Sequence, residues 1–429
     1  MAIVMRQSAW RVTCRFSGVN LASRVLFLCA CLSIPSLAHA KTLEELLVEK
    51  GVITKAEAKV IEPTTASKVY WNRGTRVEFP ESGFTTSLTT QIQSRYEFID
   101  REGEEDPKNT SGFTVNRARL TLAGTALNRE FAYKLQTDFV GTEDDKESGD
   151  SPAVRDAYLQ WQPCEDGNGI RMGQFKTAVS RQFNVDQAML QFADRSEVSE
   201  FFSLGRANGA MAFGQMGDGF VSGSLGIFNG QSEGEGLNRP PTDVRHTGVA
   251  SARISPFGKM NSQDESDVEW TELPALSLGT TYAYSQGRNE LSGVSDSFDS
   301  QIVNVDAAFK FAGYSASAEV FYQHYHWQDG PLVEPLGFYT QTGYFLVPRK
   351  VEIAGRYGQV DCGGGDAGPG VCAGVDKLHE VSATVNYYFW RHSLKAQFGY
   401  DHQRRDLSGS DSQDDGVANR WIFQISGYF

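Results

Sequence analysis

Apolar and polar side chains alternate with a period of two along most of this chain, from Phe84 to the last residue, Phe429. Segment 84–98, FTTSLTTQIQSRYEF, has Phe, Leu, Ile and Tyr on one face and mainly Thr, Gln, Arg and Glu on the other. Neighbouring side chains of a β-strand point to opposite faces, so this alternation predicts strands with one apolar and one polar face. We predict sixteen such strands, over residues 84–98, 113–124, 131–139, 154–162, 169–177, 207–216, 220–230, 244–255, 275–286, 301–312, 314–326, 337–346, 349–359, 378–389, 393–404 and 419–429.

The connections between these predicted strands alternate between short and long. Tight turns such as 217–219 and 347–348 alternate with long acidic loops such as 100–112 and 141–152. Short turns at one end and long loops at the other are typical of an outer-membrane β-barrel, which crosses the bilayer with tilted strands. The connection 256–274 departs from this pattern, because it is long where the alternation expects a short turn.

The last predicted strand, 419–429, places Trp421 and Phe423 on the same face as the terminal Phe429. Chain termini normally fray in water, so a strand that runs to the last residue indicates a closed structure. A secreted β-sandwich would also alternate, but its polar faces would carry many lysines and glutamates. Here those faces carry mainly Thr, Ser, Gln and Asn, and aromatic residues gather at strand ends. We therefore predict an all-β fold, a sixteen-stranded antiparallel transmembrane barrel over residues 84–429.

The first forty residues have the form of an export signal. Arginines precede the apolar run 25–32, and Ala-His-Ala at 38–40 is a cleavage site. The apolar run is too short to span a bilayer, and no segment after residue 40 approaches the ~20 apolar residues of a membrane helix. An export signal followed by a barrel predicts the outer membrane of a Gram-negative bacterium.

Residues 41–63 precede the barrel and have a different pattern. TLEELLVEKG and TKAEAKVIEP each open with a capping box and end at Gly51 and Pro63, respectively. This pattern predicts a short periplasmic helical hairpin, followed by a linker over residues 64–83.

The chain is acidic, with a formal net charge of −13, and loss of the four signal arginines gives −13 − 4 = −17. An acidic chain without a basic stripe argues against nucleic-acid binding. Cys362 and Cys372 bracket a glycine-rich loop, and export implies an oxidising compartment, so we predict a disulfide between them. A metal site there would need more ligands than this stretch offers.

The sequence contains none of the catalytic motifs that we sought. His379-Glu380 is not followed by the second histidine of a zinc-protease helix, and no G-x-S-x-G occurs. The acidic stretch 411–416 lacks the closing glutamate of a calcium loop. We therefore predict no catalytic residue, no cofactor and no metal.

The polar faces of the predicted strands carry charged residues that a barrel would point into its lumen. The inward cations are Arg95, Arg117, Arg119, Lys134, Arg171, Arg253, Lys310, Arg356 and Lys395, and the inward acids are Glu97, Asp138, Asp156, Asp306, Glu319, Glu352, Glu380 and Asp401. Cations along a pore lower the barrier for anions, and arginine binds phosphate or carboxylate through two parallel hydrogen bonds. The alternative is that these charges pair across strands and only solvate the lumen.

The connection 178–206 is the longest and, unlike the acidic loops, mixes apolar residues with charges. A loop with its own apolar residues must pack on a surface, so we expect it to fold against the inner wall and form the constriction. The alternative is an external loop that packs on a neighbouring subunit. The predicted anion contacts are Arg95, Arg117, Arg119, Lys134, Lys176 and Arg206, with Asp138 as a counter-charge that holds an arginine in place.

Several segments of the chain are similar to one known family. FTVNRARLTLAG, REFAYKLQTDF, VRDAYLQWQP, IRMGQFKTAVS, DRSEVSEFFSLGRANGAMAFG, YTQTGYFLVPRKVEIAGRYG and NRWIFQISGYF resemble, in this order, the phosphate-selective porin O and P family. The resemblance implies a sixteen-stranded barrel in outer-membrane lipid, a homotrimer, and a third external loop that folds inward with arginines that gather phosphate. The terminal Phe429 looks like the signal by which barrel-insertion machinery recognises such proteins.

The chain departs from that family in three respects. It has Asn116-Arg117 where members often carry paired arginines, it has only 14 lysines, and its loops are acidic. An acidic vestibule repels anions at low salt. We predict a passive porin that prefers small anions, phosphate or a similar oxyanion. The alternatives are a general or cation-preferring nutrient porin, and an envelope-tethering or adhesion barrel in which the loops and the 41–63 hairpin act.

Overall fold

The computed structural model describes residues 50–51, 67–102, 109–140, 153–163, 167–230, 242–258, 260, 264–289, 296–328, 332–363, 372, 375–407 and 416–429. The predicted export signal and all of the predicted helical hairpin except residues 50–51 lie outside these ranges. No helix in the described ranges is long and apolar enough to cross a membrane.

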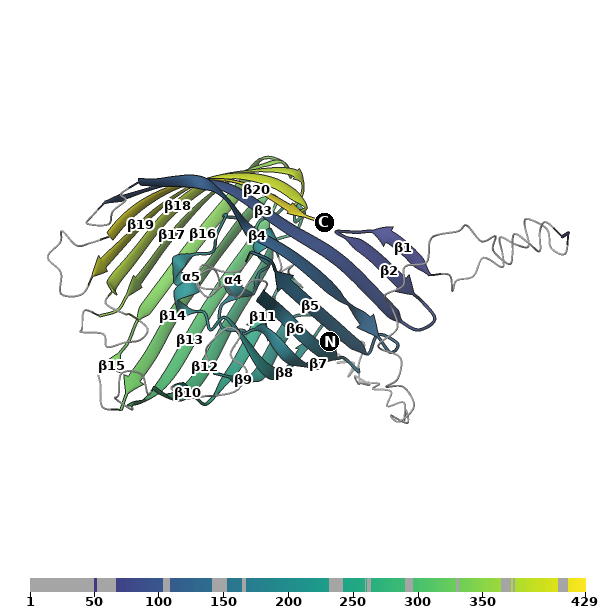
Figure 1. Ribbon diagram of the computed structural model, residues 1–429, viewed down its shortest axis with the longest axis horizontal. Coiled ribbons are helices and arrows are strands. Elements are labelled where there is room, and N and C mark those ends of the chain that lie inside the picture. Colours follow the sequence, from purple (N-terminus) through teal and green to yellow (C-terminus); the bar gives the residue numbers. More distant parts are fainter. Residues whose placement is uncertain are drawn as a thin grey trace, which may run out of the picture.

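The described residues form one sheet of 20 strands, four of which are short, so 20 − 4 = 16 long strands make a closed antiparallel barrel (Figure 1). Each of the sixteen predicted strands corresponds to one of them, which confirms that part of the prediction. The long strands are β3 (Phe84–Glu102), β4 (Asn109–Ala126), β5 (Phe131–Asp138), β6 (Ala153–Trp161), β7 (Gly169–Lys176), β8 (Arg206–Met216), β9 (Val221–Asn229), β11 (His246–Ile254), β12 (Ala275–Asn289), β13 (Asp296–Phe311), β14 (Tyr314–Trp327), β16 (Leu336–Val347), β17 (Val351–Asp361), β18 (Val375–Trp390), β19 (Leu394–Leu407) and β20 (Gly416–Tyr428).

The barrel closes between its first and last long strands. β20 pairs with β3 from Val417 opposite Glu102 to Tyr428 opposite Gln91. Beyond this ladder, the backbone N–H of Phe429 donates to the carbonyl of Thr90 at 2.9 Å. The terminal residue is therefore part of the wall, as the alternation in the last strand predicts.

The two faces of the wall differ as the alternation predicts. On β3, Leu88 and Ile92 are exposed on the outside, whereas Gln91 and Gln93 are buried on the inside. The same order holds on β18, where Val381, Val385 and Tyr387 are exposed and Glu380, Ser382, Thr384 and Asn386 are buried. A belt of exposed apolar side chains around a polar interior is the arrangement of a barrel surrounded by lipid.

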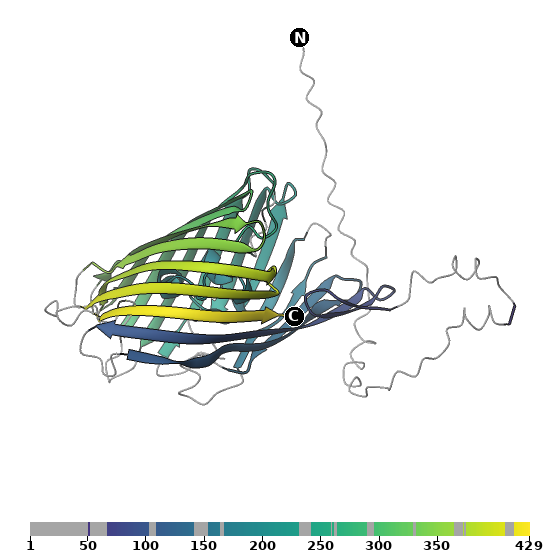
Figure 2. The same cartoon turned by 90° about the horizontal axis from the view of Figure 1, so that it is seen from above.

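Four short strands lie outside the sixteen. β1 (Lys68–Trp71) and β2 (Thr75–Phe79) form a hairpin, and β2 pairs with the start of β3, with Thr75 opposite Leu88. Figures 1 and 2 show this hairpin projecting beyond the end of the barrel, near the C-terminus. The segment 64–83, which we expected to be a linker, therefore contains a hairpin, because the first residues of β3 extend past the end of β20 and leave an edge to pair with. The other short strands are β10 (Thr242–Val244) and β15 (Leu332–Val333).

The connection between β7 and β8, residues 177–205, folds into the barrel, and we call it the inner loop. It contains α4 (Arg181–Asn184), η3 (Gln187–Met189) and α5 (Glu197–Phe202). Figure 1 shows α4 and α5 inside the outline of the wall. Phe202 stacks on Phe321 of β14, with ring centroids 5.0 Å apart. Lys395 of β19 donates to the carbonyl of Leu190 at 2.6 Å. These contacts confirm the prediction that this connection packs on the inner wall.

The connection between β11 and β12 also enters the barrel, from the end with the short turns. Its residues 264–274 meet the inner loop: Glu265 accepts a hydrogen bond from the backbone N–H of Gln191 at 2.7 Å. The hydroxyl of Ser266 bonds to Glu352 on the wall at 2.9 Å. This contact accounts for the unusual length of the connection, which the sequence pattern left unexplained.

A disulfide joins Cys362, just after β17, to Cys372, with the sulfur atoms 2.07 Å apart. The pair packs with Val360 and Leu378, in the same apolar cluster as Phe202 of the inner loop.

Candidate functional site

The inner loop brings charged side chains of the wall together in three groups. We call them the Asp194 cluster (Arg95, Arg117, Arg420, Glu97, Asp194 and Asp401), the Asp156 cluster (Arg119, Lys134, Arg206, Asp138 and Asp156) and the Asp306 cluster (Arg181, Arg253 and Asp306). Each combines residues from at least two strands, and the Asp194 and Asp306 clusters also include a residue of the inner loop. Among the described residues, no group of three or more His, Cys, Asp or Glu side chains is arranged to hold a metal ion.

The Asp194 cluster ties the inner loop to β3, β4 and β20. Arg95 donates from both terminal nitrogens to the two carboxylate oxygens of Asp194, each at 2.9 Å, and from Nη1 to Glu97 at 2.7 Å. Arg420 lies 3.2 Å from Asp194 and 2.8 Å from Asp401. Arg117 completes the cluster at 3.6 Å from Asp194.

Charge in this cluster is balanced, with three guanidinium groups and three carboxylates. Burial alone would raise the pKa of Asp194, but Arg95 and Arg420 outweigh it and hold that pKa well below its usual range. The carboxylates are as accessible as the cations, since 23 % of the Asp194 side chain and 21 % of that of Arg420 are exposed. An ion in the lumen therefore meets both signs of charge at this surface.

The Asp156 cluster lies at the base of the inner loop, on β4, β5, β6 and β8. Lys134 contacts Asp156 at 2.6 Å and Arg206 contacts it at 2.9 Å, so one carboxylate forms ion pairs with two cations. Arg119 donates to Asp138 at 2.6 Å. Lys134 is the exposed charge: 25 % of its side chain is exposed, against 6 % for Arg119 and Arg206, 5 % for Asp156 and 1 % for Asp138. This surface therefore presents positive charge to the lumen.

Lys176 at the end of β7 reaches the same region. Its ammonium group donates to the carbonyl of Val185 in the inner loop at 2.9 Å. Asp186 follows directly; burial would raise its pKa, but Lys176, the backbone N–H of Ala188 and Lys134 lower it. Lys176 therefore holds the inner loop in place beside the Asp156 cluster.

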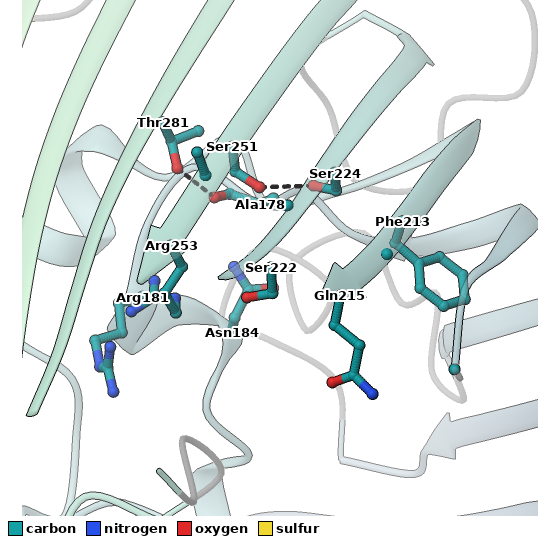
Figure 3. Close-up of a pocket in the computed structure, with 14 residues that line it drawn as sticks. Ala178, Arg181, Asn184, Phe213, Gln215, Ser222, Ser224, Ser251, Arg253 and Thr281 are labelled. Atoms are coloured by element: carbon teal, nitrogen blue, oxygen red, sulfur yellow. Dashed lines mark hydrogen bonds between the residues drawn. The ribbon is translucent and has the colours of Figure 1, made fainter. Parts of the chain in front are cut away.

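The Asp306 cluster lies beside a cavity of about 340 Å³ between the start of the inner loop and the wall of β8, β9 and β11 (Figure 3). Arg253 of β11 donates to both oxygens of Asp306, at 2.7 and 2.8 Å. Arg181 of α4 donates to the same carboxylate at 3.1 Å. Burial and the neighbouring Arg253 lower the pKa of Arg181. Asp306 is buried, whereas 26 % of the Arg253 side chain is exposed.

The six cations that we predicted as anion contacts lie in two separate clusters. Arg95 and Arg117 belong to the Asp194 cluster, whereas Arg119, Lys134 and Arg206 belong to the Asp156 cluster with Lys176 beside it. Asp138 contacts Arg119 at 2.6 Å.

Sequence reasoning missed Asp194, Arg420 and Arg181 as members of a site. Asp194 and Arg181 lie in the inner loop, where no alternation says which way a side chain points. Arg253 and Asp306 were predicted to face inward, but nothing in the sequence indicated that they meet. The alternation on β20 could have identified Arg420, which has the parity of the inward Gln424.

A family model described as phosphate-selective porin O and P matches residues 87–425. An uncharacterised protein of Aquifex aeolicus is 25 % identical over 371 residues, which cover 79 % of this chain and 85 % of that protein. Among solved structures, the outer-membrane channel DcaP of Acinetobacter baumannii covers 81 % of this chain and 98 % of its own, with a TM-score of 0.55 and 14 % identity.

Two further solved structures have the same fold. An anion-selective porin from Comamonas acidovorans is 10 % identical and has a TM-score of 0.53, over 80 % of this chain and 99 % of its own. The trimer form of OmpT from Vibrio cholerae is 11 % identical and has a TM-score of 0.52, over 81 % of this chain and 100 % of its own. At these identities, the likeness to solved structures establishes the barrel and nothing finer.

Proposed function

Because the chain belongs to the phosphate-selective porin O and P family and has the fold of outer-membrane porins, we propose that it is a passive, water-filled channel that prefers anions. Its favoured solute is phosphate or a similar oxyanion. The inner loop narrows the lumen, and the cations at its base set the preference.

One observation carries this proposal: in the Asp156 cluster both acids and both arginines are buried, and the exposed charge is the ammonium group of Lys134. A solute in the lumen approaches Lys134 directly, whereas Asp156 and Asp138 are buried. Coulomb energy falls with distance and with the dielectric between the charges, so the accessible charge dominates what a passing ion experiences. Two cations on Asp156 also leave a net positive charge there.

Phosphate fits this surface better than a halide does. The guanidinium group presents several N–H donors in a planar fork that matches an oxyanion, and an ammonium group adds a compact charge. Lys134 supplies the exposed ammonium group at the base of the inner loop, and the largely buried Arg119 and Arg206 supply guanidinium groups in the same cluster. Arg95 and Arg117 contribute less in this proposal, because accessible carboxylates of the Asp194 cluster neutralise them.

A general or cation-preferring channel is the second candidate. The accessible carboxylates Asp194 and Glu97 favour it, as does the formal net charge of −13. The third prediction, an envelope-tethering or adhesion barrel, depends on residues 41–63, which lie almost entirely outside the described ranges.

The proposed setting is the outer membrane of a Gram-negative bacterium, as a homotrimer in lipid. The belt of exposed apolar side chains supports contact with lipid. The trimer form of the structurally similar OmpT supports an oligomer. Insertion through recognition of Phe429 remains part of the proposal, supported by the pairing of this residue with Thr90 at the closing seam.

Planar-bilayer recordings test the anion preference. In a KCl gradient, the reversal potential of the wild-type channel should indicate preferential passage of chloride, and millimolar phosphate should reduce the chloride current. Lys134→Gln removes the most exposed cation of the Asp156 cluster while Arg206 still pairs with Asp156. We expect the half-blocking phosphate concentration to rise about fivefold, because a unit charge 4 Å away is worth about 1 kcal/mol in water.

The matched control is Lys350→Gln, at the exposed turn between β16 and β17. It removes the same charge away from the inner loop and should change neither measurement. A reversal potential that favours cations in the wild-type channel would contradict the proposal.

A further inference from the structure

The cavity beside the Asp306 cluster contains none of the residues that the proposed phosphate contacts require. Its lining comes from the start of the inner loop and from β8, β9, β11 and β12, with Arg181 and Arg253 side by side on one flank (Figure 3). We propose that this cavity is a second solute site, which binds a small organic monocarboxylate with a hydroxylated body.

The charge at this flank exceeds what fastening the loop requires. One guanidinium would suffice to pair with Asp306, but both Arg181 and Arg253 do so. Glu319 on the next strand is a second acid here, but it is fully buried and accepts hydrogen bonds from the backbone N–H groups of Arg181 and Gln182 and from the hydroxyl of Tyr339. Both acids are therefore buried, and the charge accessible from the cavity is that of Arg253, whose side chain is 26 % exposed.

Both arginines retain hydrogen-bond donors for a ligand. Arg181 uses Nη1 for Asp306 and Ser277, and Arg253 uses Nη1 for both of these and Nη2 for Asp306. Among the described residues, nothing accepts a hydrogen bond from Nε or Nη2 of Arg181 or from Nε of Arg253. A carboxylate at this flank would receive charge-assisted hydrogen bonds from these free donors.

The size and the lining of the cavity select an organic anion. A volume of about 340 Å³ is in the range of sites for organic ligands and far exceeds one phosphate ion. In the described part of the chain, the hydroxyl of Ser222 and the side-chain oxygen of Asn184 have no partner, so both remain for the hydroxyl groups of a ligand. Ser224 and Ser251 bond to each other at 2.7 Å and add a polar floor.

The far flank of the cavity has an aromatic side chain with a cation behind it. Phe213 lines the cavity, and the guanidinium group of Arg171 lies 5.6 Å from the centre of its ring. Arg171 donates to Gln160 and has no carboxylate partner among the described residues. Phe213 offers an apolar surface to the carbon chain of a ligand, and Arg171 keeps the surrounding potential positive.

This inference rests on the proposed channel, since the solute must enter the lumen, but not on the sign of its ion preference. The test uses the full chain in planar bilayers, with sodium gluconate as the organic monocarboxylate and sodium phosphate as the inorganic probe. We expect gluconate at millimolar concentration to reduce the single-channel current. Arg253→Gln should raise its half-blocking concentration at least tenfold and leave the half-blocking concentration of phosphate within twofold.

Two further variants guard against misfolding and against a loss of charge elsewhere. Ser222→Trp fills the cavity without changing any charge, and it should abolish the block by gluconate while the block by phosphate persists. Arg129→Gln, at the exposed turn between β4 and β5, removes one arginine away from the cavity and should change neither block.

Block by gluconate that survives both Arg253→Gln and Ser222→Trp would overturn the inference. Loss of both blocks in Arg253→Gln would also overturn it, because the cavity would then bind anions without regard to their organic part. A cation-selective reversal potential with gluconate block that depends on Arg253 would support this site and contradict the proposed function. The two proposals can therefore fail separately.

Discussion

The Asp194 and Asp156 clusters both join arginines of the wall to carboxylates, yet the first presents a neutral surface to the lumen and the second a positive one. In the Asp194 cluster, the acids Asp194 and Glu97 are at least as accessible as the arginines, and acids and cations are equal in number. In the Asp156 cluster, the acids are buried and Lys134 is exposed in front of them. The difference teaches that the number of arginines does not decide the field of a pore. The placement of their counter-charges does, because accessible charges act on an ion through a shorter path.

The inner loop causes this difference. It contributes Asp194 to one cluster, so a loop carboxylate enters between arginines that would otherwise face the lumen. At its base, the loop contributes carbonyl oxygens to Lys176 and leaves Lys134 uncovered. The same segment therefore neutralises one side of the lumen and leaves the other side positive.

The largest effect expected from this comparison is on stability. Asp138→Ala leaves the buried guanidinium of Arg119 without its partner, and we expect the free energy of unfolding to fall by about 3–5 kcal/mol. Glu97→Ala removes a partly exposed acid whose partner Arg95 keeps Asp194, and it should cost about 1 kcal/mol or less. Urea unfolding followed by tryptophan fluorescence measures both variants. Equal losses would show that the two clusters do not differ in the burial of their acids.

The next effect concerns ion preference. Asp194→Asn removes an accessible negative charge and leaves three guanidinium groups with two carboxylates. We expect the ratio of anion to cation permeability to rise about fivefold, the equivalent of about 1 kcal/mol for one charge 4 Å away in water. Reversal potentials in a KCl gradient give this ratio. Asp218→Asn, at the exposed turn between β8 and β9, is the matched control and should leave it unchanged; an equal rise in the control would remove the cluster from the explanation.

The smallest expected effect is the pH dependence of the difference in ion permeability between the wild-type channel and Asp194→Asn. Because the arginines lower the pKa of Asp194, its negative charge is present above that pKa and disappears only as the pH falls through it. The permeability difference between the wild-type channel and Asp194→Asn should therefore be the same at pH 5 as at pH 7. If the permeability ratios of the wild-type channel and Asp194→Asn became equal by pH 5, the guanidinium groups would not hold Asp194 in its ionised form. Glu197, whose pKa burial and Glu380 raise, is present in both channels and cancels in the comparison.

Alternation along the chain was enough to predict the sixteen long strands and the side of the wall on which Arg95, Lys134 or Arg253 lies. Side chains along a strand alternate with a period of two, so the local sequence decides which face of the wall each residue lies on. A shift of one residue would turn every apolar side chain into the lumen. The apolar residues of the 178–206 connection were likewise enough to predict that it packs inside. The β1–β2 hairpin escaped prediction, because its five-residue second strand depends on an edge that exists only where β3 extends beyond β20.

The sequence by itself therefore determined the wall, its closing strand and the inward set of charges, since each depends on side chains a few residues apart. Only the tertiary structure decided which charges meet. Arg95 and Asp194 are 99 residues apart, Arg181 and Asp306 are 125 apart, and no local pattern relates them. Their contacts depend on the stagger of all the strands and on where the inner loop lies across the lumen. For that reason, the neutral Asp194 cluster, the positive Asp156 cluster and the cavity beside Asp306 appear only in the folded barrel.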